Sequence, residues 1–169
     1  MLVNEREVPN YWPGGCFGCS RTNPHGLHLR FWYSEHGCFT RHTIPDHLCG
    51  IDGIVHGGIL ALLLDEVAQW TNIARLGRFG MTRNISIRYL KAVRTNTEII
   101  VESQIISRDD KNAVQQSTIH TADGTLVAES RSEWMLPSPS VIARVTSADE
   151  ETLHQFLAKY SRKEETVEE

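Results

Sequence analysis

One long apolar stretch with two acids in its middle constrains this chain more than any other feature. It begins near Gly57 and runs to about Arg75, and Gly77 then suits the left-handed conformation that ends helices. A helix that is apolar on almost every side is a buried helix. Because an ionised carboxylate is costly to bury without a partner, Asp65 and Glu66 are candidates for chemistry.

One stripe of this predicted helix carries only small or polar side chains. Its members are spaced three and four residues apart: Gly58, Ala61, Asp65, Ala68, Gln69 and Asn72. Such a face leaves room for a ligand to lie against the helix. Asp65 belongs to it, whereas Glu66 lies on the bulkier side, so Asp65 is the preferred catalytic acid and Glu66 the alternative.

The rest of the chain predicts an antiparallel sheet. Strand-like runs lie at about 27–33 and 38–44 before the helix, and at about 81–91, 97–107, 112–121 and 125–136 after it. Turn residues separate the runs, and Asp123-Gly124 is a strong hairpin signal. We expect a hairpin, the helix and then a meander. Since one sheet must cover one apolar helix, the fold class is α+β, a curved antiparallel sheet wrapped around a long central helix.

The 169 residues suffice for one domain with a sizeable core. We divide the chain into an irregular N-terminal segment (1–25), the sheet-and-helix domain (26–137) and a C-terminal short helix with a charged tail (138–169). Capping-box spacing at 147–150 predicts where the short helix starts. Its apolar stripe consists of Leu153, Phe156, Leu157 and Tyr160.

Charge and composition exclude several classes of partner. A net charge of −4 argues against general nucleic-acid binding. There is no secretory signal and no apolar run of about 20 residues that could span a bilayer, so we expect a cytoplasmic protein without a membrane partner. The four cysteines are then expected to be thiols rather than disulfides.

A cationic block occupies part of this acidic chain. Between Val67 and Thr97 there is no acid, and the basic residues there are Arg75, Arg78, Arg83, Arg88, Lys91 and Arg94. Such a block suits a compact polyanion. The alternative is that Arg75 and Arg78 favour the negative end of the helix while the others cover a solvated strand face.

The segment before the first strand contains Cys16 and Cys19, followed by His25 and His28. Two cysteines with two residues between them occur in zinc sites and in redox pairs. The second pair of zinc ligands is missing at the usual distance, and no strand leads into a helix here as a thioredoxin-type pair requires. We therefore favour packed thiols that hold the N-terminal segment, with no metal and no cofactor, and keep zinc and redox chemistry as alternatives.

Three features together resemble one family. They are the order of elements, His56-Gly57-Gly58 with an aspartate nine residues after the histidine, and the later strand at 82–90. In these the chain resembles the hot-dog fold thioesterases of the phenylacetate-degradation (PaaI-like) and THEM type, from about Cys16 to Leu136. The lead-in from Cys16 to Leu27 is also similar to that of many members. The resemblance implies a hot-dog fold and hydrolysis of an acyl-coenzyme A (acyl-CoA) to a free acid and CoA.

The resemblance also implies roles for individual residues. Asp65 would be the general base or the nucleophile, and the backbone N–H of Gly57 or Gly58 would hold the oxyanion. His56 would position the thioester, and the hydroxyl of Thr82 would hold the water. The alternatives are that the glycines form only a tight entry turn and that Asp65 is a buried structural acid. In many members an asparagine precedes the histidine by six residues, but this chain has glycine there. That glycine is Gly50. The role of the missing asparagine would then have to be taken by His47, Asp52, Gln69 or a residue of a second subunit.

Helix geometry bears on this assignment. Backbone N–H groups at a helix start are prearranged donors for a developing oxyanion. At about 1.5 Å per residue, however, Asp65 lies about 10–12 Å along the axis from that start. The site should therefore combine Asp65 of one subunit with Gly57 or Gly58 of another, as in family members whose central helices pair in a dimer. We expect a homodimer or a dimer of dimers.

We expect Arg83, Arg88 and Lys91 to meet the phosphates of the nucleotide. The acyl group would lie along the small-residue stripe, at Ala61 and Gln69. The main rival is a hot-dog module that binds an acyl thioester without catalysis, which would be expected to lack a usable acid. A hot-dog dehydratase is less favoured, because its proline-rich histidine loop ahead of a helix acid is absent.

Overall fold

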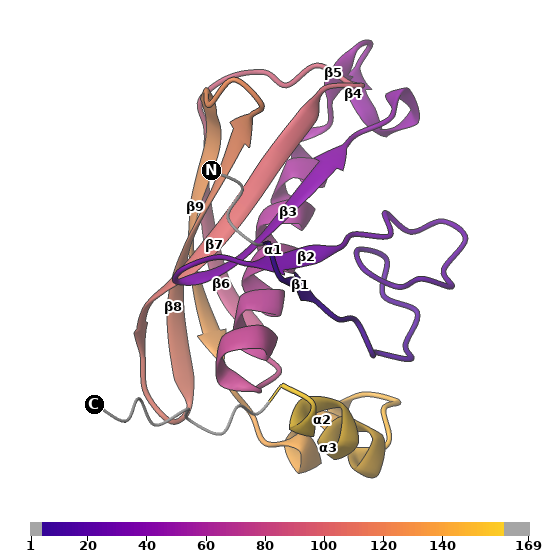
Figure 1. Ribbon diagram of the computed structural model, residues 1–169, viewed down its shortest axis with the longest axis vertical. Coiled ribbons are helices and arrows are strands. Elements are labelled where there is room, and N and C mark those ends of the chain that lie inside the picture. Colours follow the sequence, from indigo (N-terminus) through magenta and orange to yellow (C-terminus); the bar gives the residue numbers. More distant parts are fainter. Residues whose placement is uncertain (1–4, 161–169) are drawn as a thin grey trace.

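A curved antiparallel sheet wraps around one long helix in the computed structural model, which describes residues 5–160 (Figure 1). The helix is α1 (Gly57–Leu76), and the sheet has the order β1-β2-β3-β7-β8-β9-β6. Its strands are β1 (Glu7–Val8), β2 (Phe31–Tyr33), β3 (Gly37–Thr43), β6 (Met81–Tyr89), β7 (Glu98–Arg108), β8 (Asn112–Thr121) and β9 (Leu126–Met135). The predicted α+β class, with the sheet around the helix, is confirmed.

The shorter elements lie at the two ends of α1. A 3₁₀ turn, η1 (Asp46–Leu48), and a small hairpin of β4 (Cys49–Ile51) and β5 (Ile54–Val55) precede the helix. Two further helices, α2 (Pro139–Val145) and α3 (Glu150–Ala158), lie together beyond its other end (Figure 1). Within residues 5–160, no helix is both long and apolar enough to cross a membrane.

The caps of α1 explain why its limits follow from the sequence. The His56 ring accepts the N–H of Gly58 at the start, and Gly77 ends the helix with a φ of 60°. A side chain is strained in that conformation, so glycine is the suitable residue there. Between the caps, Leu63, Leu64 and other apolar side chains are buried against the sheet. The predicted helix is confirmed to within a residue or two.

The predicted meander is right only for β7, β8 and β9. The preceding strand, β6, pairs antiparallel with β9 and not with β7. Both sides of β7 are already occupied, by β3 and by β8, so β6 takes the free side of β9. The connection after β6 is held against β5, where the Val55 N–H donates to the Val93 carbonyl at 2.9 Å. As a result β6 forms one edge of the sheet.

The two ends of the chain differ in part from expectation. β1 lies within the segment predicted to be irregular. α2 was not predicted, and α3 is capped by Asp149, whose carboxylate accepts the N–H of Thr152, instead of by the predicted capping box at Ser147. The apolar stripe of α3 is buried as predicted, from Leu153 to Tyr160. The predicted charged tail, 161–169, lies outside the described residues.

A buried polar network joins the helix to the sheet. Gln115 of β8 is fully buried, and its amide donates to the Ala68 carbonyl at 3.0 Å and to the Asn72 side chain at 2.8 Å. It also accepts the hydroxyl of Ser103 at 2.8 Å. Two residues of the small-residue stripe, Ala68 and Asn72, are therefore buried against the sheet. The others, Gly58, Ala61, Asp65 and Gln69, remain at least partly exposed.

We expect Gln115→Met to lower the free energy of unfolding by about 1–3 kcal/mol, because it retains the approximate volume but leaves Asn72 and Ser103 without their partner. Urea or thermal unfolding measures this change. The control is Gln116→Met, since Gln116 is exposed on the other face of β8 and should tolerate the same replacement. Equal stability of the two variants would contradict a stabilising role for the network.

Candidate active site

Asp65 lies in the middle of α1 and is half-buried. Its Oδ1 accepts a hydrogen bond of 2.8 Å from the Thr82 hydroxyl at the start of β6. Burial raises the pKa of Asp65, and the hydrogen bond from Thr82 partly opposes that shift. The structure thus brings together two of the predicted site residues, which are far apart in the sequence.

A hollow of about 240 Å³ adjoins Asp65 and Thr82. Aromatic side chains form much of its lining: Trp12, Trp70, Phe79, Trp134 and Phe156. Trp12 meets Phe79 edge to face at 5.1 Å, and Phe79 stacks on Phe156 at 5.2 Å. The hollow therefore combines a few polar groups, among them the Asp65 carboxylate, with a largely aromatic wall, which is the usual composition of a small-molecule site.

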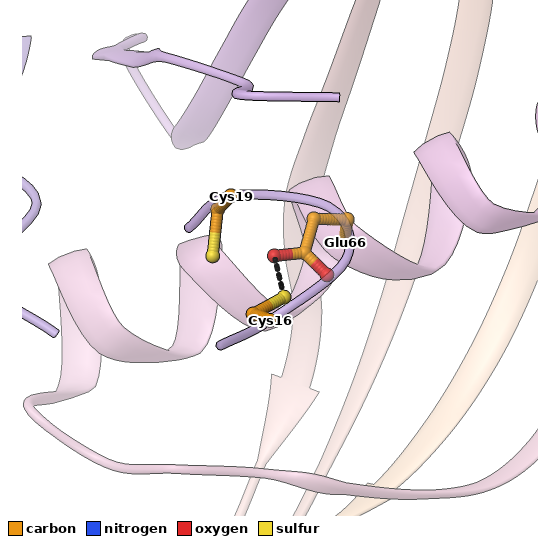
Figure 2. A group of neighbouring side chains, drawn as sticks. All are labelled: Cys16, Cys19 and Glu66. Carbon is orange, nitrogen blue, oxygen red and sulfur yellow. Dashed lines mark hydrogen bonds between the residues drawn. The ribbon is translucent and has the colours of Figure 1, made fainter. Parts of the chain in front are cut away.

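Glu66, the alternative acid, contributes to another part of the same hollow. The Cys16 thiol donates to its Oε1 at 3.3 Å (Figure 2). Burial, reinforced by the neighbouring Cys16, raises the pKa of Glu66 to about 8. A hydrogen bond from the Cys19 thiol lowers the pKa of Cys16, and the same bond together with burial raises the pKa of Cys19. Glu66 thus faces the two thiols, whereas Asp65 faces a hydroxyl.

The start of α1 presents one free donor. The N–H of Gly58 donates to His56 Nδ1 at 2.8 Å and is therefore occupied. The N–H of Gly57 has no partner among residues 5–160. Of the two predicted oxyanion donors, only Gly57 is available in this geometry. His56 orients the helix start through its ring nitrogen.

Gly57 and Asp65 belong to different hollows of one chain. Gly57 lies with Leu60, Tyr89 and Lys91 in a hollow of about 330 Å³, and the Tyr89 hydroxyl donates to its carbonyl at 3.0 Å. With about 1.5 Å of helix per residue, roughly 12 Å separate Gly57 from Asp65. Within one subunit, the Gly57 N–H and the Asp65 carboxylate are therefore too far apart to act on the same substrate carbonyl group. Ala61, the other predicted stripe residue, is half-buried between them.

Gly50 lies against the histidine that the family asparagine would accompany. A Cβ at this position would come within 3.2 Å of His56 Cδ2, a tight contact, so a side chain here would require the ring to shift by a few tenths of an ångström. Gln69 is no substitute, because its amide holds both the N–H and the carbonyl of Gly80, at 2.9 and 3.1 Å. Gln69 nevertheless contributes to the lining of the hollow at Asp65.

The predicted cationic block is dispersed. Arg75 donates to backbone carbonyls of the β2–β3 turn, and Arg78 to the carbonyl of Leu136, so these two support the fold. Arg88 pairs with Glu129 at 2.7 Å beside a separate shallow hollow. Arg83 is exposed, and Lys91 lies beside Gly57. Of the three predicted phosphate contacts, Lys91 is therefore the one at the helix start.

Sequence reasoning missed the aromatic wall and Tyr89. The alternation of Ile85, Ile87 and Tyr89 along β6 is a signal that would place Tyr89 on the helix side. No local pattern marks Trp12 or Phe79, because they come from irregular segments and meet only in the folded chain.

This architecture and site define a hot-dog protein with a carboxylate on its central helix. Residues 52–128 match the family model of the thioesterase superfamily. Over 77 residues the chain is 30% identical to acyl-coenzyme A thioesterase THEM4 of Mus musculus, a stretch that is 46% of this chain and 33% of the relative. The chain thus matches about a third of the length of that relative.

Solved structures agree on the fold. A thioesterase from Streptococcus pneumoniae, described with coenzyme A, is 20% identical with a TM-score of 0.60, covering 64% of this chain and 85% of the other. The E. coli PaaI protein of the phenylacetic acid degradation operon is 16% identical with a TM-score of 0.61, covering 66% and 80%.

Proposed function

We propose that the protein hydrolyses an acyl-CoA thioester to a free acid and CoA. The observation that carries this proposal is the Asp65 carboxylate, half-buried in an apolar helix and hydrogen-bonded to Thr82 at the wall of an aromatic hollow. A carboxylate in such a place is positioned to act on a water or on a carbonyl carbon. The names of THEM4 and of the CoA-bound structure support acyl-CoA as the substrate class.

The proposed chemistry uses few groups. As general base, Asp65 takes a proton from a water that Thr82 helps to hold, and the resulting hydroxide attacks the thioester carbon. The oxyanion that forms accepts the N–H of Gly57 at the positive end of α1. The carbon–sulfur bond then breaks, and the CoA thiolate takes up the proton. As nucleophile, Asp65 would instead form an anhydride that water hydrolyses.

The position of β6 supports a site shared between two subunits. Thr82 near its start contacts Asp65, and Tyr89 at its end contacts Gly57. Because β6 is an edge strand, two copies can pair there antiparallel around a twofold axis. Thr82 of one strand then lies near the partner subunit's Tyr89. This pairing would place Asp65 beside the partner subunit's Gly57.

The two hollows suggest how the substrate is divided. The acyl group would enter the aromatic hollow beside Asp65, past Ala61 and Gln69. The nucleotide phosphates would lie nearer Lys91 and Arg83, which have no ion pair among residues 5–160. Arg88 already has a carboxylate partner in Glu129 and would contribute less.

Thiol release from short, long and aromatic acyl-CoA substrates tests the activity. We expect at least one class to give one thiol per acid formed. If the protein binds acyl-CoA but releases no thiol, it is a non-catalytic module that binds acyl thioesters and the proposed hydrolysis is wrong. Reversible hydration of an enoyl-CoA without release of CoA would indicate a dehydratase. Sedimentation or size exclusion of the same preparation tests the dimer separately.

A further inference from the structure

Three metal-ligating side chains from two distant parts of the chain converge beside the hollow at Asp65. Cys16 and Cys19 come from the N-terminal segment, and Glu66 comes from α1 (Figure 2). Their two sulfur atoms and one carboxylate oxygen all lie within 4.8 Å of one another. The proposed hydrolysis uses none of the three.

The backbone holds this arrangement in place. The Ser20 N–H donates to the Cys16 carbonyl at 3.0 Å, closing a tight turn that directs both sulfur atoms toward α1. The next segment holds the turn through two hydrogen bonds. The Leu27 N–H donates to the Phe17 carbonyl at 2.8 Å, and the Leu29 N–H donates to the Gly18 carbonyl at 2.9 Å. A Cβ on Gly18 would lie 2.6 Å from Glu66 Cδ, so any other residue there would displace the carboxyl group from its present place.

The charges of the cluster favour a cation. Both thiols and the carboxyl group become negative when they lose their protons, and none of residues 5–160 forms an ion pair with Glu66. Cys19 is only 4% exposed. Loss of these protons leaves buried negative charges, which need a counter-charge. Two thiolates with one carboxylate suit zinc, whose ligands are sulfur, nitrogen and carboxylate oxygen.

We propose that Cys16, Cys19 and Glu66 bind one Zn²⁺ ion, leaving a fourth position toward the hollow that they line together with Asp65. In a tetrahedral zinc site the ligand atoms lie about 3.6–3.8 Å apart. Cys16 Sγ and Glu66 Oε1 are 3.3 Å apart, and no two of the three ligand atoms are more than 4.8 Å apart, so side-chain shifts of about 1 Å bring them to these distances. The ion fixes the N-terminal segment to α1 and completes one wall of the hollow.

The expectation from sequence, packed thiols without metal, rested on the missing second pair of ligands. The structure supplies a third ligand, Glu66, from far along the chain. His28 is not part of this cluster, whose ligand atoms come from Cys16, Cys19 and Glu66.

Metal content tests the site without any substrate. The full chain is expressed without a histidine tag in medium with added zinc, and its metal content is measured by elemental mass spectrometry. We expect about one zinc per chain. Cys16→Ser, Cys19→Ser and Glu66→Gln should each lower zinc retention after dialysis at least tenfold. Cys49→Ser is the matched control, because Cys49 is a free thiol outside the cluster, and it should retain the metal.

Cobalt substitution gives a second readout. Co²⁺ added to the chelated protein should produce thiolate charge-transfer absorption and the visible bands of tetrahedral cobalt, and Cys19→Ser should lose the charge-transfer absorption. Circular dichroism shows that each variant is folded. If the wild type retains no zinc and binds no added cobalt, or if the three variants bind as tightly as Cys49→Ser, the proposal is wrong and the cluster is a set of hydrogen-bonded thiols. None of these results depends on hydrolysis.

Discussion

Gly57→Pro should reduce kcat for acyl-CoA hydrolysis by about 10²–10³-fold, the usual effect of removing one oxyanion donor. Proline has no N–H, so the variant lacks the donor that is free at the start of α1. The first helical position accepts proline, and His56 already has the extended conformation that must precede it, with φ −63° and ψ 132°. Thiol release at saturating substrate measures the loss, and thermal unfolding should be little changed.

Gly57→Ala is the matched control, because it adds a side chain but retains the N–H. Its Cβ would meet the Tyr89 ring at 3.7 Å, an ordinary contact. We expect this variant to remain within a few-fold of the wild type. An equal loss in both variants would attribute the effect to crowding, and no loss in the proline variant would place the oxyanion donor elsewhere.

Asp65→Asn should reduce kcat by about 10²–10⁴-fold, since it removes the proposed base or nucleophile. Asparagine has nearly the same shape and its carbonyl can still accept the Thr82 hydroxyl, so the fold should be unchanged. Asp110→Asn, an exposed acid in the β7–β8 turn, is the control for the loss of one charge. If Glu66→Gln abolishes thiol release while Asp65→Asn and Cys16→Ser retain it, Glu66 is the catalytic acid.

The two inactive variants together test the shared site. In a heterodimer of Asp65→Asn with Gly57→Pro, one of the two sites receives an intact Asp65 and an intact Gly57. Random exchange of subunits should then restore about one quarter of the wild-type activity. Mixtures that stay inactive although the subunits exchange would show that each site lies within one chain.

The sequence was most informative where local chemistry decides the structure. The limits of α1 follow from its caps and its apolar pattern, and the strands follow from alternation and turns. The place of β6 did not follow, because strand order depends on which edges remain free after β3 and β8 have paired with β7. For β6, the next strand in the sequence is not its partner in the sheet.

The candidate site divides in the same way. The family resemblance predicts that Asp65 and Thr82 belong to one site, with Thr82 holding the water, and in the structure the Thr82 hydroxyl donates directly to Asp65 at 2.8 Å. The contact of Glu66 with Cys16 had no sequence signal, since it depends on how the N-terminal segment crosses α1. The phosphate contacts stay a prediction. The sequence does not reveal that one of the three residues, Arg88, already pairs with Glu129.

Two side chains of the aromatic wall come from opposite ends of the chain. Trp12 and Phe156 meet at 5.2 Å, and both lie outside residues 52–128, where the superfamily match is found. The carboxylate and the helix start lie inside that stretch. In a protein built this way, exchange of the terminal segments would change the wall of the hollow and leave Asp65 and the start of α1 in place.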